Sequence, residues 1–209
     1  MKNLKEIIQE KLNRTKSSLM LEKLKINSKS KVYSGKVGDI IENYELNGKK
    51  YNLVCCISAD QAKDNQARFI IDDADFKFVW LTDQNDNCRQ DVKDTENGKE
   101  DINGKENNEV LLKYYRNPKK GKRYFCVSQE ILERYGDECY LPAAGELKLM
   151  HNNLETINSK LENKISEDDY YWSSTQANIS FAYTLQTYYG DIAGTKKMQK
   201  INVRPFIQI

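Results

Sequence analysis

The pattern of apolar and polar positions is most regular between residues 139 and 175, where it predicts one long amphipathic helix followed by a strand. Apolar residues recur there at alternating spacings of three and four, which places them on one stripe of a helix. They are Leu147, Met150, Leu154, Ile157 and Leu161. The helix cannot begin before Pro142, which lacks an amide hydrogen but is tolerated in a first turn. Charged residues occupy the opposite face, which we expect to contact water: Lys148, Glu155, Lys160 and Glu162.

Short apolar or alternating segments on both sides of this helix predict strands. Asn47-Gly48 lies between two of them and is typical of a β-hairpin. Further strands are expected at 53–57, 69–71, 76–81, 124–127, 170–174, 181–189 and 201–209. Ser128 is expected to cap a second, short helix that ends at Gly136. Strands, two helices and then strands again indicate an α+β fold.

Residues 82–109 are rich in Asp, Asn, Lys and Gly, and they contain the sequence NGKE twice. This composition predicts a long surface loop. Within it, residues 83–94 space acidic and amide side chains partly as in a calcium-binding loop. However, Cys88 stands where such a loop needs glycine, and Asp94 is too short to act as the bidentate Glu. We therefore assign no metal ligands and expect no cofactor.

Residues 1–36 differ in composition from the rest and predict a helical arm and linker before a domain at 37–209. Two short amphipathic helices are expected. Because helices this short are marginal alone, their apolar residues need a partner surface, which is their own domain, a sister subunit or another protein. These residues are Leu4, Ile7, Ile8, Leu12, Leu21 and Leu24. Residues 1–32 hold nine of the 33 basic and three of the 31 acidic residues, giving the arm a net charge of +6 and the remainder −4. The arm either docks on an acidic surface or has only a solvated helix face.

The cysteines and the single histidine suggest no catalytic chemistry. None of the five cysteines forms a CxxC pair, and the adjacent Cys55 and Cys56 should point to opposite faces of a strand. His151 lies off the apolar stripe, with no nucleophile motif near it. No segment has the pattern of a signal peptide or a membrane span, so we expect synthesis in the reducing cytoplasm, free thiols and no membrane insertion. The whole-chain charge of +2 suggests no nucleic-acid partner.

Three short motifs resemble those of one bacterial and phage family. LPAAGEL at 141–147, WSST at 172–175 and VRPF at 203–206 are similar, in order and spacing, to the LPSxGEL, WSST and VRPV signatures of the Lcl C-terminal domain family. That family resembles C-type lectins, formylglycine-generating enzymes and retroelement-diversified variable proteins. The resemblance covers about residues 37–209. It implies a C-type-lectin-like domain with two helices against antiparallel strands.

The same motifs suggest framework residues and argue against two activities. Arg204 matches the family's arginine and should pair with a carboxylate or carbonyl groups near the WSST strand. Glu146 lies in the first turn of a helix, where the helix dipole favours a carboxylate, and Trp172 should lie in the core. Formylglycine-generating enzymes use a cysteine pair late in the domain, but no cysteine follows Cys139. The EPN, QPD and WND motifs of calcium-dependent sugar binding are also absent.

Aromatic residues gather late in the chain and provide the candidate ligand-binding site. Tyr188 and Tyr189 lie at an expected hairpin end, so at least one should be exposed. Together with Asn178, Gln186 and Asp191 they would form an adaptable contact surface, or stack on sugars. The alternative is that such rings fill the core, as we expect for Trp172 and Phe181. In the retroelement-diversified relatives, the recognition surface is built in this C-terminal region.

Residues 22–32, EKLKINSKSKV, resemble N-terminal segments of virion proteins from crAss-like and other Bacteroides phages. Together the resemblances imply a non-enzymatic virion protein, attached to the capsid or tail as a decoration, fibre or adhesin. Residues 1–36 would bind other virion proteins or form a homo-oligomer, and residues 37–209 would bind a host-surface glycan or protein. Two further hypotheses stay open: a purely structural virion subunit, and a stand-alone bacterial ligand-binding domain.

Overall fold

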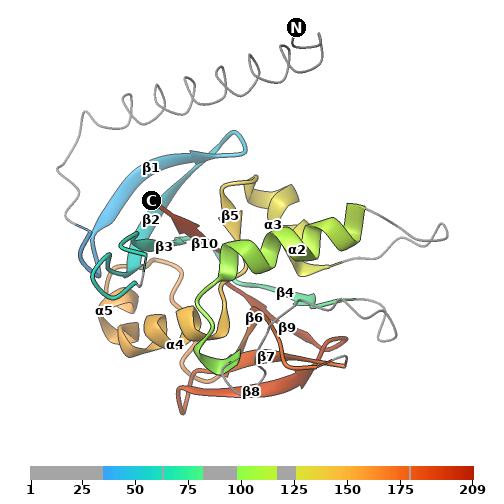
Figure 1. The fold of residues 1–209 in the computed structure, drawn as a ribbon. Helices are drawn as coiled ribbons and strands as arrows, with labels where there is room; N and C mark the ends of the chain where they lie inside the picture. The colour runs from blue at the N-terminus through green and yellow to red at the C-terminus, as the bar shows by residue number, and fades with distance from the viewer. Residues whose placement is uncertain (1–34, 63, 82–97, 117–125, 179) are drawn as a thin grey trace, which may run out of the picture. The chain divides into compact units, whose positions relative to one another are not determined.

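The computed structural model describes residues 35–62, 64–81, 98–116, 126–178 and 180–209 (Figure 1). Residues Gly35–Ile209 form one compact unit. Its described part is a mixed α+β fold in which two five-stranded sheets dominate and four α-helices pack on them. The six predicted anchor residues, Leu4, Ile7, Ile8, Leu12, Leu21 and Leu24, lie outside the described residues, as do Cys88 and the segment 83–94.

The first sheet has the strand order β1-β2-β3-β10-β5, and its pairs are all antiparallel. Its members are β1 (Ile40–Leu46), β2 (Lys49–Ile57), β3 (Arg68–Ile71), β10 (Phe206–Gln208) and β5 (Cys139–Tyr140). The predicted hairpin joins β1 to β2 through Asn47 and Gly48, whose φ angles of 49° and 78° suit these two residue types. The last strand, β10, lies between β3 and β5, so it joins the early strands of this sheet to a strand from the middle of the chain.

The second sheet has the order β4-β9-β6-β7-β8. Its members are β4 (Phe76–Val79), β9 (Lys200–Val203), β6 (Tyr170–Gln176), β7 (Phe181–Gln186) and β8 (Asp191–Lys196). Strands β6 and β9 pair in parallel, which corrects the expectation of antiparallel strands throughout. Pro205 lies between β9 and β10, at the step where the chain leaves one sheet for the other. The missing amide hydrogen of proline therefore falls outside both ladders.

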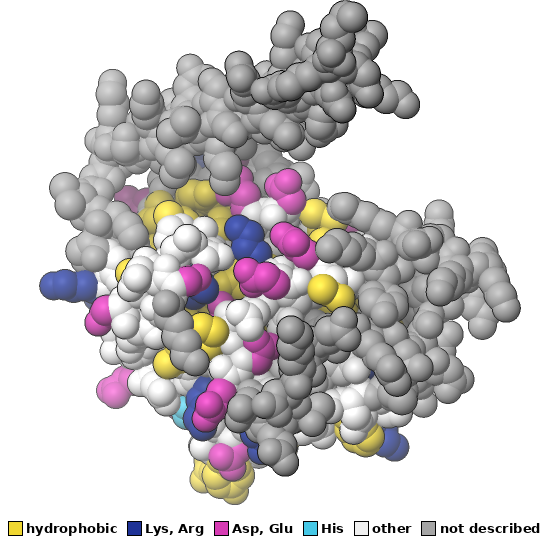
Figure 2. Space-filling model, viewed as in Figure 1, with side chains coloured by type: hydrophobic (Ala, Val, Ile, Leu, Met, Phe, Trp, Pro, Cys, Tyr) yellow, Lys and Arg dark blue, Asp and Glu magenta, His cyan; other side chains and the backbone are white. Residues whose placement is uncertain are grey.

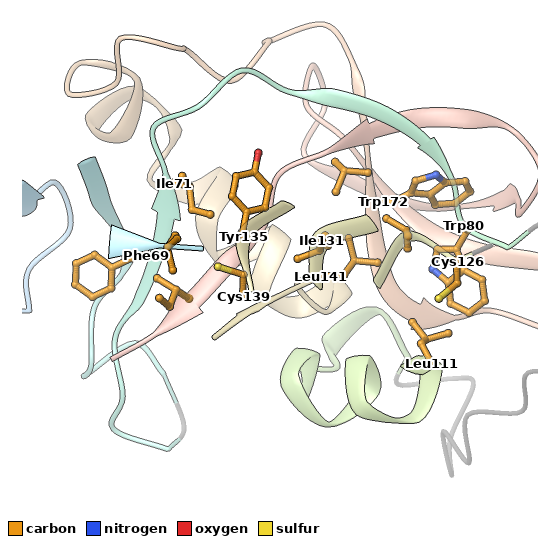
Figure 3. Close-up of a cluster of buried hydrophobic side chains, with 14 of the residues drawn as sticks. Phe69, Ile71, Trp80, Leu111, Cys126, Ile131, Tyr135, Cys139, Leu141 and Trp172 are labelled. Carbon is orange, nitrogen blue, oxygen red and sulfur yellow. The ribbon is translucent and has the colours of Figure 1, made fainter. Parts of the chain in front are cut away.

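Residues 53–57 of β2 and the whole of β3 are buried on both faces of the first sheet, which explains their unbroken apolar runs. Alternate residues of a strand point to opposite faces, so Leu53 and Cys55 enter one hydrophobic cluster while Val54 and Cys56 enter another. The first cluster contains Trp80 and residues from both sheets and two helices (Figure 3). The four cysteines among the described residues, Cys55, Cys56, Cys126 and Cys139, are all buried.

The second hydrophobic cluster contains the whole predicted apolar stripe, Leu147, Met150, Leu154, Ile157 and Leu161. The single helix expected there is instead two, α4 (Ala144–Asn152) and α5 (Leu154–Asn158). The chain breaks at Asn153, whose φ and ψ of −109° and 9° are not helical. Its side-chain amide donates to the carbonyl oxygens of Cys56 and Leu149, so a local hydrogen bond competes with the helix.

The other helices are a 3-10 turn, η1 (Gly98–Glu100), and two α-helices, α2 (Gly104–Arg116) and α3 (Val127–Tyr135). Helix α2 corrects the prediction of a loop up to residue 109. Its buried face carries Asn107 and Asn108 beside Leu111. Because two of these buried residues are amides, the sequence shows no apolar stripe for this helix. Ser128 lies inside α3, whose N-cap residue is Cys126, and is not the cap. The helix does end at Gly136, with φ of 91°.

Two further expectations can be compared with the fold. Two helices were expected in the domain, whereas its described residues contain four α-helices. Phe181 is only partly buried and not in the core, because it begins β7 at the end of the sheet. No helix within the described ranges is both long and apolar enough to cross a membrane.

Candidate binding surface

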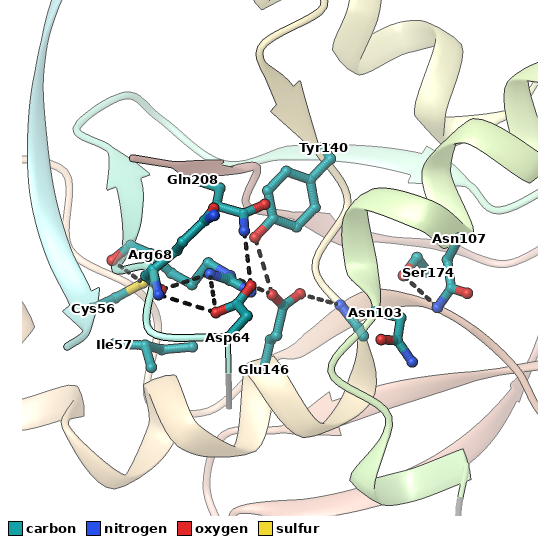
Figure 4. Close-up of polar contacts among 12 residues, drawn as sticks. Cys56, Ile57, Asp64, Arg68, Asn103, Asn107, Tyr140, Glu146, Ser174 and Gln208 are labelled. Carbon is teal, nitrogen blue, oxygen red and sulfur yellow. Dashed lines mark hydrogen bonds and ion pairs between the residues drawn. The ribbon is translucent and has the colours of Figure 1, made fainter. Parts of the chain in front are cut away.

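A buried ion pair joins strand β3 to the first turn of helix α4. Glu146, in the first turn of α4, accepts a hydrogen bond from Arg68 Nε at 2.7 Å and another from the hydroxyl of Tyr140 at 3.0 Å (Figure 4). Its second oxygen accepts the backbone N–H of Ala143 at 2.9 Å, which satisfies an open helix amide. Burial raises the pKa of Glu146 to about 6, against the stabilising effect of Arg68.

The surroundings of Glu146 leave no free space. A Cβ atom added at Gly104 would collide with its Oε2 atom, so the start of α2 needs glycine to pack there. Arg68 also forms an ion pair with Asp64, in which Asp64 Oδ2 lies 2.8 Å from Arg68 Nη2. Both Arg68 and Glu146 are buried. This network is therefore a structural joint between β3, β5 and α4 rather than an accessible site.

Arg204 forms a second buried joint. Its Nε atom lies 2.7 Å from Asp75 Oδ1, and its two terminal nitrogens donate to the backbone oxygens of Ile71, Asp73 and Asn163. The second oxygen of Asp75 accepts the hydroxyl of Tyr171, the residue before the WSST segment. Burial raises the pKa of Asp75, and Arg204 opposes that shift. One guanidinium thus fixes the β3–β4 turn, the segment before β6 and the step between β9 and β10.

The WSST segment links β6 to the start of α4. Trp172 is fully buried and donates its indole N–H to the oxygen of Phe78 at 2.9 Å. Ser174 donates its backbone N–H to Pro142 O at 2.7 Å, and Thr175 accepts the N–H of Ala144 through its hydroxyl at 3.0 Å. The Thr175 hydroxyl donates to Asp101 at 2.8 Å. These contacts explain why small hydroxyl residues follow the tryptophan.

The exposed aromatic surface is at the turn between β7 and β8, residues 186–191, which we call the tyrosine tip. Tyr188 and Tyr189 are 65% and 66% exposed, the largest values among the exposed large hydrophobic side chains of the described residues. Their ring centroids are 4.6 Å apart with an interplanar angle of 89°, an edge-to-face pair. Figure 2 shows hydrophobic side chains protruding at the lower edge of the molecule, beside acidic ones.

The backbone of the tyrosine tip is held by two neighbouring elements. Thr187 and Asp169 form three hydrogen bonds of 3.0 Å, two through backbone N–H groups and one donated by the Thr187 hydroxyl. His151 of α4 lies with its Nε2 atom 2.7 Å from Thr187 O. Because a carbonyl oxygen only accepts, the Nε2 atom must carry a proton. Gly190, with φ of +70°, packs so closely on the His151 ring that an added Cβ would lie 2.6 Å from it.

The five predicted ligand-binding residues do not all meet. Gln186 and Asp191 are paired in register at the base of the tyrosine tip, next to Tyr188 and Tyr189. Asn178 lies at the opposite end of β7, where its side-chain oxygen accepts the N–H groups of Ser180 and Phe181. Its carbonyl is thus used to stabilise a turn, and it is not part of the tyrosine tip.

The sequence analysis named Glu146 and Arg204 as framework residues, but it missed their partners and the residues that hold the tip. Arg68 and Asp75 gave no signal, since each is charged and isolated in sequence from the residue it pairs with. Thr187 lies within the expected strand 181–189 and has no role of its own in the sequence pattern, and His151 lies off the apolar stripe with no nucleophile motif near it. No cluster of three or more His, Cys, Asp or Glu side chains able to hold a metal ion occurs within the described ranges.

Comparison with known proteins gives a distant similarity of fold. No protein-family model matches the sequence, and no curated protein matches it either. Among solved structures, the chain is similar to a fimbrial protein from Bacteroides ovatus ATCC 8483, with a TM-score of 0.52 and 20% sequence identity. The similarity covers 68% of this chain and 36% of that protein. The chain thus spans little more than a third of the fimbrial protein's length, and the likeness concerns the fold alone.

Proposed function

We propose that residues 35–209 form a non-enzymatic attachment domain whose contact surface is the tyrosine tip. The observation that carries this proposal is the exposure of two adjacent aromatic rings, Tyr188 and Tyr189, on a turn whose backbone is fixed from both sides. Exposed aromatic residues gain free energy when a partner covers them, and tyrosine loses little conformational entropy on binding. The likeness to a fimbrial protein is compatible with a surface protein of this kind.

We further propose a C-type-lectin-like arrangement for the domain. Two features support it: β10 pairs with β3 in the first sheet, and α4 packs between this sheet and the strands that carry the tyrosine tip. The LPAAGEL, WSST and VRPF motifs lie at the joints described above. In this arrangement the first sheet contains the first and last strands of the domain, β1 and β10. The second sheet carries the tyrosine tip at one of its ends.

We propose that the protein is part of a phage particle. Residues 1–36 would anchor it on other virion proteins, and the domain would bind a host-surface glycan or protein. The net charge of +6 over residues 1–32 supports a role for this segment apart from the mildly acidic remainder of the chain. Many weakly binding copies on one particle would act together through multivalency. The alternative is a structural subunit whose tyrosine tip packs on another virion protein.

Co-sedimentation of the full chain with host cells tests the contact surface. Tyr188→Ser/Tyr189→Ser should lower the bound fraction at least about tenfold, because aromatic anchors commonly contribute 2 kcal/mol or more. Met198→Ser is the matched control, since Met198 is also exposed, at 46%, but lies beyond the opposite end of β8. Equal binding by all three proteins would contradict the attachment role of the tyrosine tip.

A pull-down from phage lysate tests the anchor separately. Full-length protein and a variant lacking residues 1–36 are compared by mass spectrometry of the captured proteins. We expect capsid or tail proteins only with the full-length chain. If the shortened chain captures the same virion proteins, the domain itself is the structural contact, and the alternative function is the better one.

A further inference from the structure

The tyrosine tip is surrounded by negative charge. Asp191 begins β8 at the tip, and Glu167, Asp168 and Asp169 form the segment that leads into β6. The three hydrogen bonds between Thr187 and Asp169 place that segment directly beside the tip. Three of the four acidic residues are exposed, and Asp169 is partly exposed. Neither 165–170 nor 186–192 contains a lysine or arginine.

The helix behind the tip does not neutralise this charge. Helix α4 contributes His151, which is hydrogen-bonded to the tip. One turn earlier α4 carries a single exposed lysine, Lys148, and the exposed Glu155 belongs to the next helix, α5. The four carboxylates of residues 167, 168, 169 and 191 therefore outnumber the one lysine of the helix packed against the tip, and this surface keeps a net negative charge.

Exposed tyrosines beside carboxylates favour some classes of ligand over others. A neutral sugar stacks on an aromatic ring, but it gains nothing from a net negative potential. An ammonium or guanidinium group gains twice: it is attracted to the face of a tyrosine ring, and the surrounding carboxylates steer it there. An anionic glycan would be repelled. The charge pattern therefore favours a cationic ligand.

We infer that the tyrosine tip binds a lysine- or arginine-bearing segment of a partner protein, with the cation over the Tyr188 and Tyr189 rings and the carboxylates of residues 167, 168 and 191 around it. This inference rests on the proposed attachment function and names the chemistry of its partner. The edge-to-face geometry leaves ring faces exposed to solvent, as a cation–π contact requires.

Binding of the full chain to fluorescent hexalysine tests the inference. We expect hexalysine to bind, and its affinity to fall about tenfold between 50 mM and 500 mM salt because exposed charges are screened. Tyr188→Ser/Tyr189→Ser should weaken binding about fivefold or more. Tyr188→Phe/Tyr189→Phe should stay within about twofold, because the ring faces remain while the hydroxyl groups are lost.

Charge reversal separates the local surface from the net charge of the chain. Glu167→Lys/Asp168→Lys should weaken hexalysine binding at least about tenfold. The matched control Glu45→Lys/Glu109→Lys changes the net charge equally, at exposed positions on β1 and α2. It should weaken hexalysine binding by less than about threefold. Equal loss in both variants, or loss in the phenylalanine variant with binding to neutral sugars instead, would overturn the inference.

The two proposals fail in different ways. If the serine variant loses cell attachment but charge reversal at 167 and 168 leaves attachment and hexalysine binding unchanged, the attachment function stands and the cationic partner is excluded. If the serine variant still attaches to cells, the attachment function fails, whatever the result with hexalysine.

Discussion

Two arginines hold the molecule together, and both are buried by more than nine-tenths. A buried guanidinium is costly unless its donors are satisfied. Arg68 is satisfied by two carboxylates, those of Asp64 and Glu146, and by a backbone oxygen. Arg204 donates to three backbone oxygens through its terminal nitrogens and forms an ion pair with one carboxylate. Each arginine joins segments far apart in the sequence, so its loss should affect the whole fold.

Replacing Arg204 by methionine tests this role. The variant leaves Asp75 buried without its cation, and we expect the free energy of unfolding to fall by about 3–5 kcal/mol. Arg134→Met is the control, because Arg134 forms an exposed pair with Glu130 one helical turn away and should lose less than about 1 kcal/mol. Urea unfolding followed by tryptophan fluorescence measures both. Similar losses in the two variants would contradict a structural role specific to Arg204.

Glu146 gives a pH dependence of known sign. Burial raises its pKa from 4.5 to about 6, so between these values the folded chain binds a proton that the unfolded chain releases. This contribution to stability is present below about pH 4.5 and is lost as the pH rises through about 6, by roughly 2 kcal/mol. Glu146→Gln cannot titrate, so the difference between the two proteins should change across this window. Urea unfolding at several pH values measures it, and parallel curves would contradict the raised pKa.

At the scale of the helix or strand, the sequence predicted those features that depend on the local pattern of apolar and turn residues. The apolar stripe from Leu147 to Leu161 is buried as expected, and the Asn47-Gly48 hairpin forms. The break at Asn153 was not predictable, because it depends on carbonyl oxygens of β2 that come close only in the fold. Helix α2 was missed since its buried face uses Asn107, which donates to Asp101 and Ser174. Amide residues of this kind are read locally as loop formers.

The rigidity of the tyrosine tip can be tested by a pair of glycine substitutions. Gly48→Ala introduces a left-handed alanine with open space around it, and should cost about 1 kcal/mol. Gly190→Ala has the same backbone penalty and a collision with His151, so it should cost more. In a His151→Ala background the additional cost should disappear, which a double-mutant cycle measures from urea unfolding. Additive effects of the two substitutions would show that the ring does not brace the tip.

At the scale of the whole molecule, the α+β class followed from the order of elements, but the arrangement of the sheets did not. The strand β10 lies between β3 and β5, and β9 pairs in parallel with β6. Both facts depend on contacts between residues more than a hundred positions apart or across several elements. For the candidate surface, the sequence indicated Tyr188 and Tyr189, yet it could not separate Asn178 from them, because the two ends of β7 are close in sequence.

Footprinting of the full chain by hydroxyl radicals, free and bound to the partner that it captures, tests the central claim most directly. We predict that oxidation of Tyr188 and Tyr189 falls several-fold in the complex, because a covering partner excludes the radicals, while Met198 stays as reactive as in the free chain. Met198 is the internal control, being exposed at the other end of β8. Unchanged oxidation of both tyrosines, with protection elsewhere on the domain, would contradict the account of the tyrosine tip as the contact surface.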